Sequence, residues 1–144
     1  NLLYGGILEL LLNLEQKGCK CFLATSKPTV YAKQILDNLK IRHFFTEIVG
    51  SNLDLTRTSK SAIIQAIIGK LTQEEKSQVI MIGDTKYDIE GAHAEHIDSI
   101  AVLYGYGTEE DFSSTSPIKI VKTVAELSHF LLFCKSKKKA ILKR

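Results

Sequence analysis

Apolar residues recur along the chain in two patterns, and the two patterns alternate from segment to segment. Spacings of three and four residues predict helices, whereas short apolar runs bounded by small or polar residues predict buried strands. The predicted helices cover residues 7–17, 28–39, 59–68, 87–96 and 123–134. The predicted strands cover residues 19–24, 46–50, 78–83, 99–105 and 118–121. This alternation favours parallel βαβ units, so we expect an α/β fold with a Rossmann-like open parallel sheet and helices on both faces.

Small and polar residues follow the predicted strands, at the edge where open α/β sheets bind their ligands. Thr25 and Ser26 end the first strand, and Asp84 follows the apolar run "QVIMIG". The loop that contains Thr25 could cradle an anion with its hydroxyl and its backbone amides. Alternatively, Ser26 caps the helix that begins near Pro28, and this is the favoured interpretation for the loop taken alone.

Lys60 lies in the first turn of a predicted helix, within "RTSKSAII". A cation at the N-terminal end of a helix opposes the helix dipole at a cost of about 0.3–1 kcal/mol. The dipole would favour an acidic residue at this position. A lysine that reaches a phosphate or a carboxylate would offset that cost. The alternative is a surface lysine with a solvated ammonium group.

Asp84 and Asp88 lie four positions apart, so Asp88 falls about one turn into the next helix. Carboxylate oxygens that leave room for water and phosphate suit Mg²⁺. The alternative is a helix capped by aspartate, with Asp88 matched to the helix dipole. For Asp88 taken alone, we favour the capping interpretation. For the two aspartates taken together with Thr25 and Lys60, we favour a binding site.

Composition limits the classes of protein that the chain can form. Its 144 residues are 44% apolar, which indicates one globular domain and no membrane span. The net charge of +3 comes from "KSKKKAILKR", which has six basic residues and no acid. A basic tail can bind nucleic acid or lipid, but we expect a solvated terminus and no nucleic acid. We therefore divide the chain into a core, residues 1–134, and a basic tail, residues 135–144.

The three cysteines are Cys19, Cys21 and Cys134. Their number is odd and their spacing fits no metal site, so we interpret them as small apolar residues in a reducing compartment. This interpretation favours a cytoplasmic protein.

Three segments together resemble the motifs of the haloacid dehalogenase superfamily, in its phosphoglycolate phosphatase-like branch. "LATSKP" resembles the second motif, "RTSK" the third and "MIGDTKYD" the fourth, in that order along the chain. The resemblance extends over about residues 1–133, and the three motifs in order are more specific than any one of them.

The resemblance implies a Mg²⁺-dependent phosphatase that acts on small phosphate esters, such as phosphoglycolate or a nucleotide, through an aspartyl-phosphate. Its partner would be a small phosphorylated metabolite. Thr25 would bind the phosphate with Ser26 beside it, and Lys60 would neutralise charge on the phosphate and the nucleophile. Asp84 would bind Mg²⁺, and Asp88 would support the metal ligands or Lys60.

The sequence departs from the family in its first motif. No Asp-x-Asp precedes Thr25, although in the family this motif supplies the nucleophile from a central strand between those ending at Thr25 and Asp84. The cap domain is absent too, and Asn1 is not methionine, so we expect a partial core. Such a chain would be inactive alone, and would either join the two flanking strands directly or associate through their exposed edges.

The main rival is a non-catalytic relic or truncated paralogue that keeps phosphate and metal binding. A receiver-like signalling domain shares the architecture but needs acids at the end of its first strand, so we rank it low.

Overall fold

Six parallel strands form one open sheet in the computed structural model, which describes residues 6–51, 60–104, 107–134 and 137–143. The strands are β1 (Lys20–Pro28), β2 (Phe45–Ser51), β3 (Val79–Gly83), β4 (Asp98–Val102), β5 (Lys119–Val121) and β6 (Lys139–Lys143). Their order across the sheet is β2-β1-β6-β3-β4-β5. The expected α/β, Rossmann-like fold is therefore confirmed.

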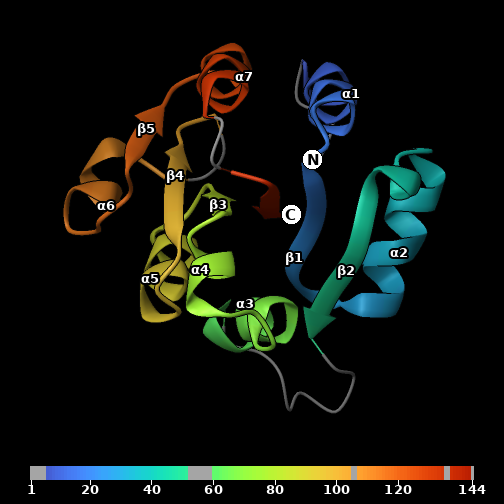
Figure 1. Cartoon of the computed structure of the whole chain (residues 1–144), viewed down its shortest axis with the longest axis horizontal. Helices are drawn as coiled ribbons and strands as arrows, with labels where there is room; N and C mark the ends of the chain where they lie inside the picture. The colour runs from blue at the N-terminus through green and yellow to red at the C-terminus, as the bar shows by residue number, and fades with distance from the viewer. Residues whose placement is uncertain (1–5, 52–59, 105–106, 135–136, 144) are drawn as a thin grey trace.

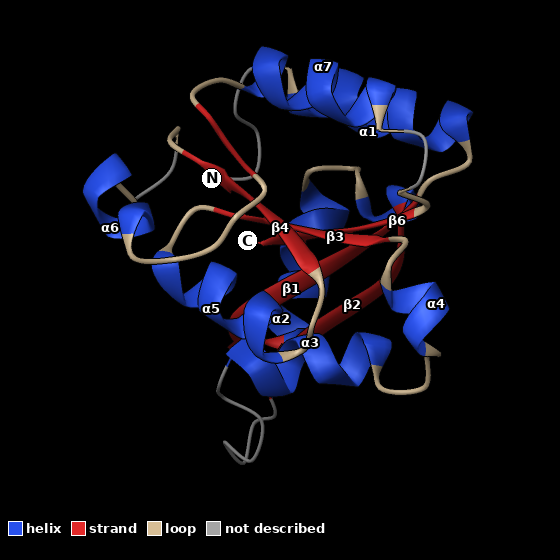
Figure 2. Cartoon of the chain, turned by 60° about the vertical axis from the view of Figure 1, so that its left-hand side comes forward, coloured by secondary structure: helices blue, strands red, loops and turns tan. Residues whose placement is uncertain are grey.

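Helices cover both faces of this sheet, as Figure 2 shows with α1 and α7 on one side and α3 and α5 on the other. The helices are α1 (Ile7–Lys17), α2 (Thr29–Asn38), the 3-10 helix η1 (Arg42–Phe44), α3 (Lys60–Ile68), α4 (Gln73–Lys76), α5 (Lys86–Ala94), α6 (Glu109–Ser113) and α7 (Val124–Phe133). The ten predicted helices and strands are all present. The structure adds η1, α4, α6 and β6, none of which the apolar pattern predicted.

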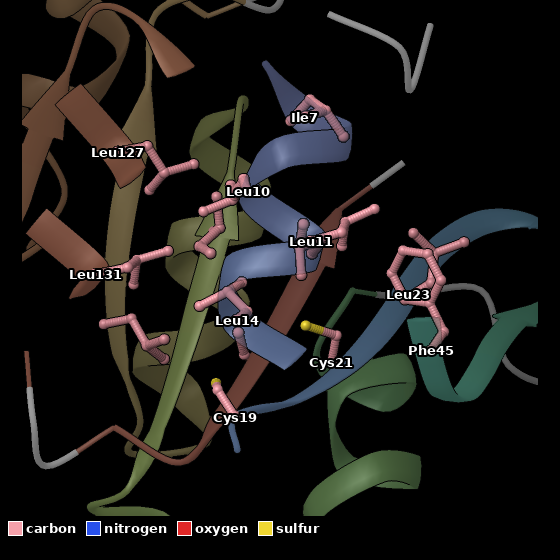
Figure 3. Packing of buried hydrophobic residues seen from close by; sticks show 14 of the residues in the cluster. Ile7, Leu10, Leu11, Leu14, Cys19, Cys21, Leu23, Phe45, Leu127 and Leu131 are labelled. Carbon is pink, nitrogen blue, oxygen red and sulfur yellow. The ribbon is translucent and has the colours of Figure 1, made fainter. Parts of the chain in front are cut away.

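Two main apolar cores lie between the helices and the sheet. In the first, Leu10 and Leu14 of α1 point toward Leu127 and Leu131 of α7 (Figure 3). Side chains of α3 and α5 form the second core on the opposite face. Strand residues alternate between the two cores because successive side chains of a strand point to opposite faces.

The C-terminal segment corrects our expectation of a solvated tail. Residues Lys139–Lys143 form β6, which lies between β1 and β3 in the middle of the sheet (Figure 1). β1, which contains Thr25, and β3, which precedes Asp84, therefore do not meet directly. They also do not expose the edges through which we expected the chain to associate. Each is paired with β6.

Side-chain burial explains why so polar a segment takes this central position. Ala140 and Leu142 enter the first core, and Ile141 enters the second between its register partners Phe22 and Met81. Ala140 and Ile141 are fully buried and Leu142 is 5% exposed. A strand covered on both faces needs a continuous apolar run, and "AIL" is long enough to supply it.

Candidate active site

The strand order reverses between β1 and β3, and such a switch point is where open α/β sheets bind ligands. Thr25 lies near this point on β1, and Asp84 follows directly after β3. The strand β6 separates them, in register with Ala24 on one side and with Ile82 on the other. Two strand spacings place the backbones of Thr25 and Asp84 about 10 Å apart.

Thr25 is fully buried, and its Oγ1 accepts a hydrogen bond of 3.2 Å from the backbone N–H of Lys27. Ser26 beside it is exposed. The predicted capping of the helix by Ser26 is wrong, because α2 begins at Thr29 after Pro28 and has no side-chain cap. Ser26 therefore has a hydroxyl that is exposed to solvent and is not used by the helix.

The ends of β1 and β2 approach each other so closely that only glycine fits at position 50. A Cβ on Gly50 would lie 2.2 Å from the carbonyl oxygen of Lys27. The backbone N–H of Gly50 donates to Oγ1 of Thr29, at 2.9 Å. This contact fixes the junction between β1 and α2 against the neighbouring strand β2.

Asp88 is buried at the start of α5 and serves as a helix cap. Its Oδ2 accepts hydrogen bonds from the backbone N–H of Asp84 at 3.2 Å, the backbone N–H of Thr85 at 3.1 Å and the Thr85 hydroxyl at 3.0 Å. Thr85 accepts in return from the N–H of Asp88, which completes a capping box. The structure therefore gives Asp88 the capping role that the sequence allowed as an alternative.

Two glycines pack around Asp84. A Cβ on Gly83 would lie 2.3 Å from the Cβ of Asp88, so glycine is required where β3 meets the cap. Gly107 donates its N–H to the carbonyl oxygen of Asp84 at 2.7 Å, and a Cβ there would lie 2.5 Å from that oxygen. The backbone of Asp84 is thus held on both sides, while its side chain is partly exposed.

Our sequence reasoning places Gly50 and Gly107 at the ends of predicted strands near the site, but it predicts neither their contacts nor a role for Thr85. The Thr-x-x-Asp spacing of Thr85 and Asp88 is a local capping signal that could have revealed the first of them. The roles of the two glycines depend on contacts with residues that are distant in the sequence, which no local pattern records.

Lys60 is the first residue of α3, which agrees with the helix predicted over residues 59–68. The position of its side chain, and the rest of "RTSK", lie outside the described residues. The structure therefore places the backbone of Lys60 at a helix start but does not test its contact with a ligand.

The partly exposed carboxylate of Asp84 fits Mg²⁺, which is usually held by one or two carboxylates together with water and phosphate. Among the described residues, no three His, Cys, Asp or Glu side chains gather closely enough to hold a metal ion. Asp84 would thus be a ligand in an open site completed by water and substrate. No helix within the described residues is long and apolar enough to span a membrane.

Comparisons with known proteins agree with this architecture. A curated 5'-nucleotidase of Pseudomonas aeruginosa is 35% identical over 133 residues, which are 91% of this chain and 59% of that protein. A phosphoglycolate phosphatase of Colwellia psychrerythraea is 32% identical over 127 residues, covering 88% of this chain and 56% of that enzyme. The crystal structure of a predicted phosphatase from Clostridium acetobutylicum superposes with a TM-score of 0.83 at 39% identity, covering 90% of this chain and 59% of that one.

The chain therefore spans a little over half the length of each of these relatives. The family model described as haloacid dehalogenase-like hydrolase matches residues 2–102, which is more than half of the chain. This chain belongs to the haloacid dehalogenase-like hydrolase family.

Proposed function

We propose that this chain is the core of a Mg²⁺-dependent phosphatase that hydrolyses small phosphate monoesters. The observation that carries the proposal is the placement of Thr25 and Asp84 on the two sides of the switch point, in a family of hydrolases. Two of its relatives are curated as a 5'-nucleotidase and a phosphoglycolate phosphatase, which favours a small phosphorylated metabolite as the substrate.

Each candidate residue has a role in this proposal. Thr25 and Ser26 bind the phosphate of the ester, and Lys60 neutralises charge as the phosphoryl group moves. Asp84 holds Mg²⁺, which supplies positive charge next to the phosphate oxygens. Asp88 keeps the turn after β3 in place through its cap, and so positions Asp84.

The nucleophile would come from outside these 144 residues, because the sequence contains no Asp-x-Asp. An aspartate would attack phosphorus and break the ester bond, and the second acid would protonate the departing alkoxide. Water would then attack the aspartyl-phosphate, restoring the carboxylate and releasing phosphate. We propose that the chain does not catalyse this reaction alone.

A second candidate is a protein that binds phosphate or metal without catalysis. The composition of β6 favours this candidate. The central strand Lys139–Lys143 carries two lysines and no acid, so it offers no carboxylate that could act as the nucleophile. Thr25 and Asp84 would keep their binding roles in such a protein. In either case, the buried thiols of Cys19 and Cys21 agree with a reducing, cytoplasmic environment, which stays a prediction.

The hydrolysis of 4-nitrophenyl phosphate distinguishes these candidates. The 144-residue chain is assayed with Mg²⁺, alone and after fusion to an apolar strand that ends in Asp-x-Asp. We expect no turnover above background from the chain, and turnover that EDTA abolishes from the fusion. A fusion in which both aspartates are asparagine is the control.

Rapid turnover by the unmodified chain would contradict the proposal, because its nucleophile would then lie within the 144 residues. An inactive fusion that still binds phosphate would favour the non-catalytic protein.

A further inference from the structure

A groove runs along one end of the sheet, between α2 and the outermost strand β2, which lie side by side in Figure 1. Its volume of about 930 Å³ falls within the range of sites that bind ligands. We call this feature the edge groove. Its lining residues are Lys33, Asp37, Lys40, Arg42, His43, Phe45, Thr46, Glu47 and Ile48.

The edge groove lies toward the opposite end of β2 from the candidate active site. Phe45, at the start of β2, pairs with Cys21, whereas Val49 pairs with Ala24, the residue before Thr25. The four positions from Phe45 to Val49 span about 13 Å of strand. A ligand in the groove would therefore leave the candidate active site accessible, and we consider the groove independently of the phosphatase proposed above.

The backbone of β2 is open to a ligand along this groove. β2 is the last strand at its end of the sheet, and β1 is its only strand neighbour within the described residues. The register of β1 and β2 also skips Thr46, and a residue skipped in this way is left out of the ladder. An extended peptide can bind such an edge by adding a strand to the sheet.

Positive charge prevails on the side of the groove that α2 forms. Lys33 and Asp37 lie one turn apart on α2, and Lys40 follows the end of the helix. Asp37 is paired with Arg42, at 3.0 Å. Lys33 and Lys40 form no ion pair within the described residues, so their charges are available to a ligand.

Glu47 is the second acid of the groove, and its side chain points away from α2. Its register partner is Phe22, whose side chain lies in the core formed with α3 and α5. Register partners point to the same face of a sheet, whereas α2 packs on the opposite face through Ala32 and Leu36. The lysines beside α2 are therefore complementary to an acidic ligand.

The backbone of Lys40 gives a separate indication that its side chain binds a ligand. The φ angle of Lys40 is 60°, in the left-handed region that favours glycine. Lys40 follows the end of α2, a position where glycine is the usual residue. Strained residues of this kind cluster at ligand sites, and this one lines the groove.

We propose that the edge groove binds an acidic, extended segment of a partner protein, which adds to the edge of β2 as a strand. Lys33 and Lys40 contact its carboxylates, and the backbone of residues 45–48 supplies hydrogen bonds. A small molecule fits less well, because Lys40, Arg42 and His43 are exposed, whereas small-molecule sites enclose most of their ligand. A symmetric contact with a second copy would bring the same lysines together.

Fluorescence anisotropy on the whole 144-residue chain tests the proposal, with a fluorescein-labelled peptide of four Val-Glu repeats as the probe. We expect Lys40→Gly to weaken binding about threefold, the size of effect typical of an exposed charge pair. The melting temperature of Lys40→Gly should equal or exceed that of the parent, because glycine relieves the strained backbone. A lysine with only a structural role would change the melting temperature and leave the affinity unaltered.

Asp37→Asn tests the sign of the charge that the groove prefers. It removes an acid and frees Arg42, so it should tighten binding about threefold. Lys33→Gln should weaken binding, and serves if Lys40→Gly does not fold. Lys119→Gln is the matched control, because Lys119 is an exposed lysine on β5, at the other end of the sheet, and should bind like the parent.

Hydrogen exchange detected by mass spectrometry locates the bound peptide. The amides of residues 45–48 should gain protection when the peptide saturates the chain. A peptide with glutamine in place of glutamate should bind more weakly, and one with proline at its centre, which cannot complete a ladder of hydrogen bonds, should not bind.

Four outcomes would overturn the proposal. Two are the absence of peptide binding and equal affinity of Lys40→Gly, Lys33→Gln and the parent. The third is a single-stranded DNA oligonucleotide that binds as tightly as the peptide and displaces it, which would show a general surface for polyanions. The fourth is a dimer in which residues 45–48 are protected without peptide, which would identify a second copy as the occupant.

Discussion

At the scale of single residues, Asp84 and Asp88 look equivalent in the sequence but have different surroundings. Asp88 is fully buried and accepts three hydrogen bonds at the cap of α5, whereas the Asp84 side chain is partly exposed at the switch point. A sequence can indicate that two carboxylates share a motif. It cannot divide capping and binding between them, because the division depends on which carboxylate the turn directs inward.

This difference predicts that substitutions of the two aspartates affect different properties. Asp88→Ala should reduce the free energy of unfolding by about 1–2 kcal/mol, since it removes the cap. Asp84→Ala should cost less stability but should weaken Mg²⁺ binding more than Asp88→Ala does, because ligands matter more than the groups that orient them. Urea unfolding and calorimetry with Mg²⁺ measure the two quantities. Equal Mg²⁺ affinity of Asp84→Ala and the parent would exclude Asp84 as a ligand.

At the scale of elements, local sequence signals predicted β1 to β5 and the long helices, but not the central strand β6. Residues 7–17 have a helical apolar stripe closed by Gly18, and the structure forms α1 at those bounds. The short helices α4 and α6 have capping boxes at Thr72 and Thr108 that could have revealed them. In β6, "AIL" is flanked by lysines and reads as part of a charged tail. It forms a strand because its backbone pairs with β1 on one side and with β3 on the other.

The same context predicts how β6 responds to substitution. Ile141 is fully buried between Phe22 and Met81, so Ile141→Asp should destabilise the chain by more than about 3 kcal/mol. Lys138→Asp, at an exposed position in the same segment, should change stability by less than about 0.5 kcal/mol. Melting temperatures by circular dichroism compare the two variants. Similar losses would show that Ile141 is not in the core.

At the scale of the whole molecule, the buried thiol on β1 links stability to pH. Burial, with smaller contributions from Cys19 and Glu15, raises the pKa of Cys21 to about 12. The thiol of an unfolded chain ionises near pH 8.5, so above that pH the unfolded state loses a proton that the native state keeps. The contribution of Cys21 to stability is thus complete below about pH 8.5 and is lost as pH rises toward 12.

We therefore expect the midpoint of urea unfolding to fall between about pH 8 and pH 10, and to fall less in Cys21→Ala. The partly exposed Cys134 provides the control variant, Cys134→Ala, which should follow the parent. If Cys21→Ala and the parent lose stability in parallel, the thiol of Cys21 does not account for the alkaline sensitivity.

The central position of β6 also has a consequence for the order of events during synthesis. A ribosome makes the chain from its N-terminus, and β1 to β5 are all synthesised before residues 139–143. The pair β1 and β2 and the group β3, β4 and β5 can each form as they emerge, but β6, the strand that joins them, arrives last. Until then, the edges of β1 and β3 that face the gap expose unpaired backbone N–H and C=O groups, and are thus open to chaperones or to a neighbouring nascent chain.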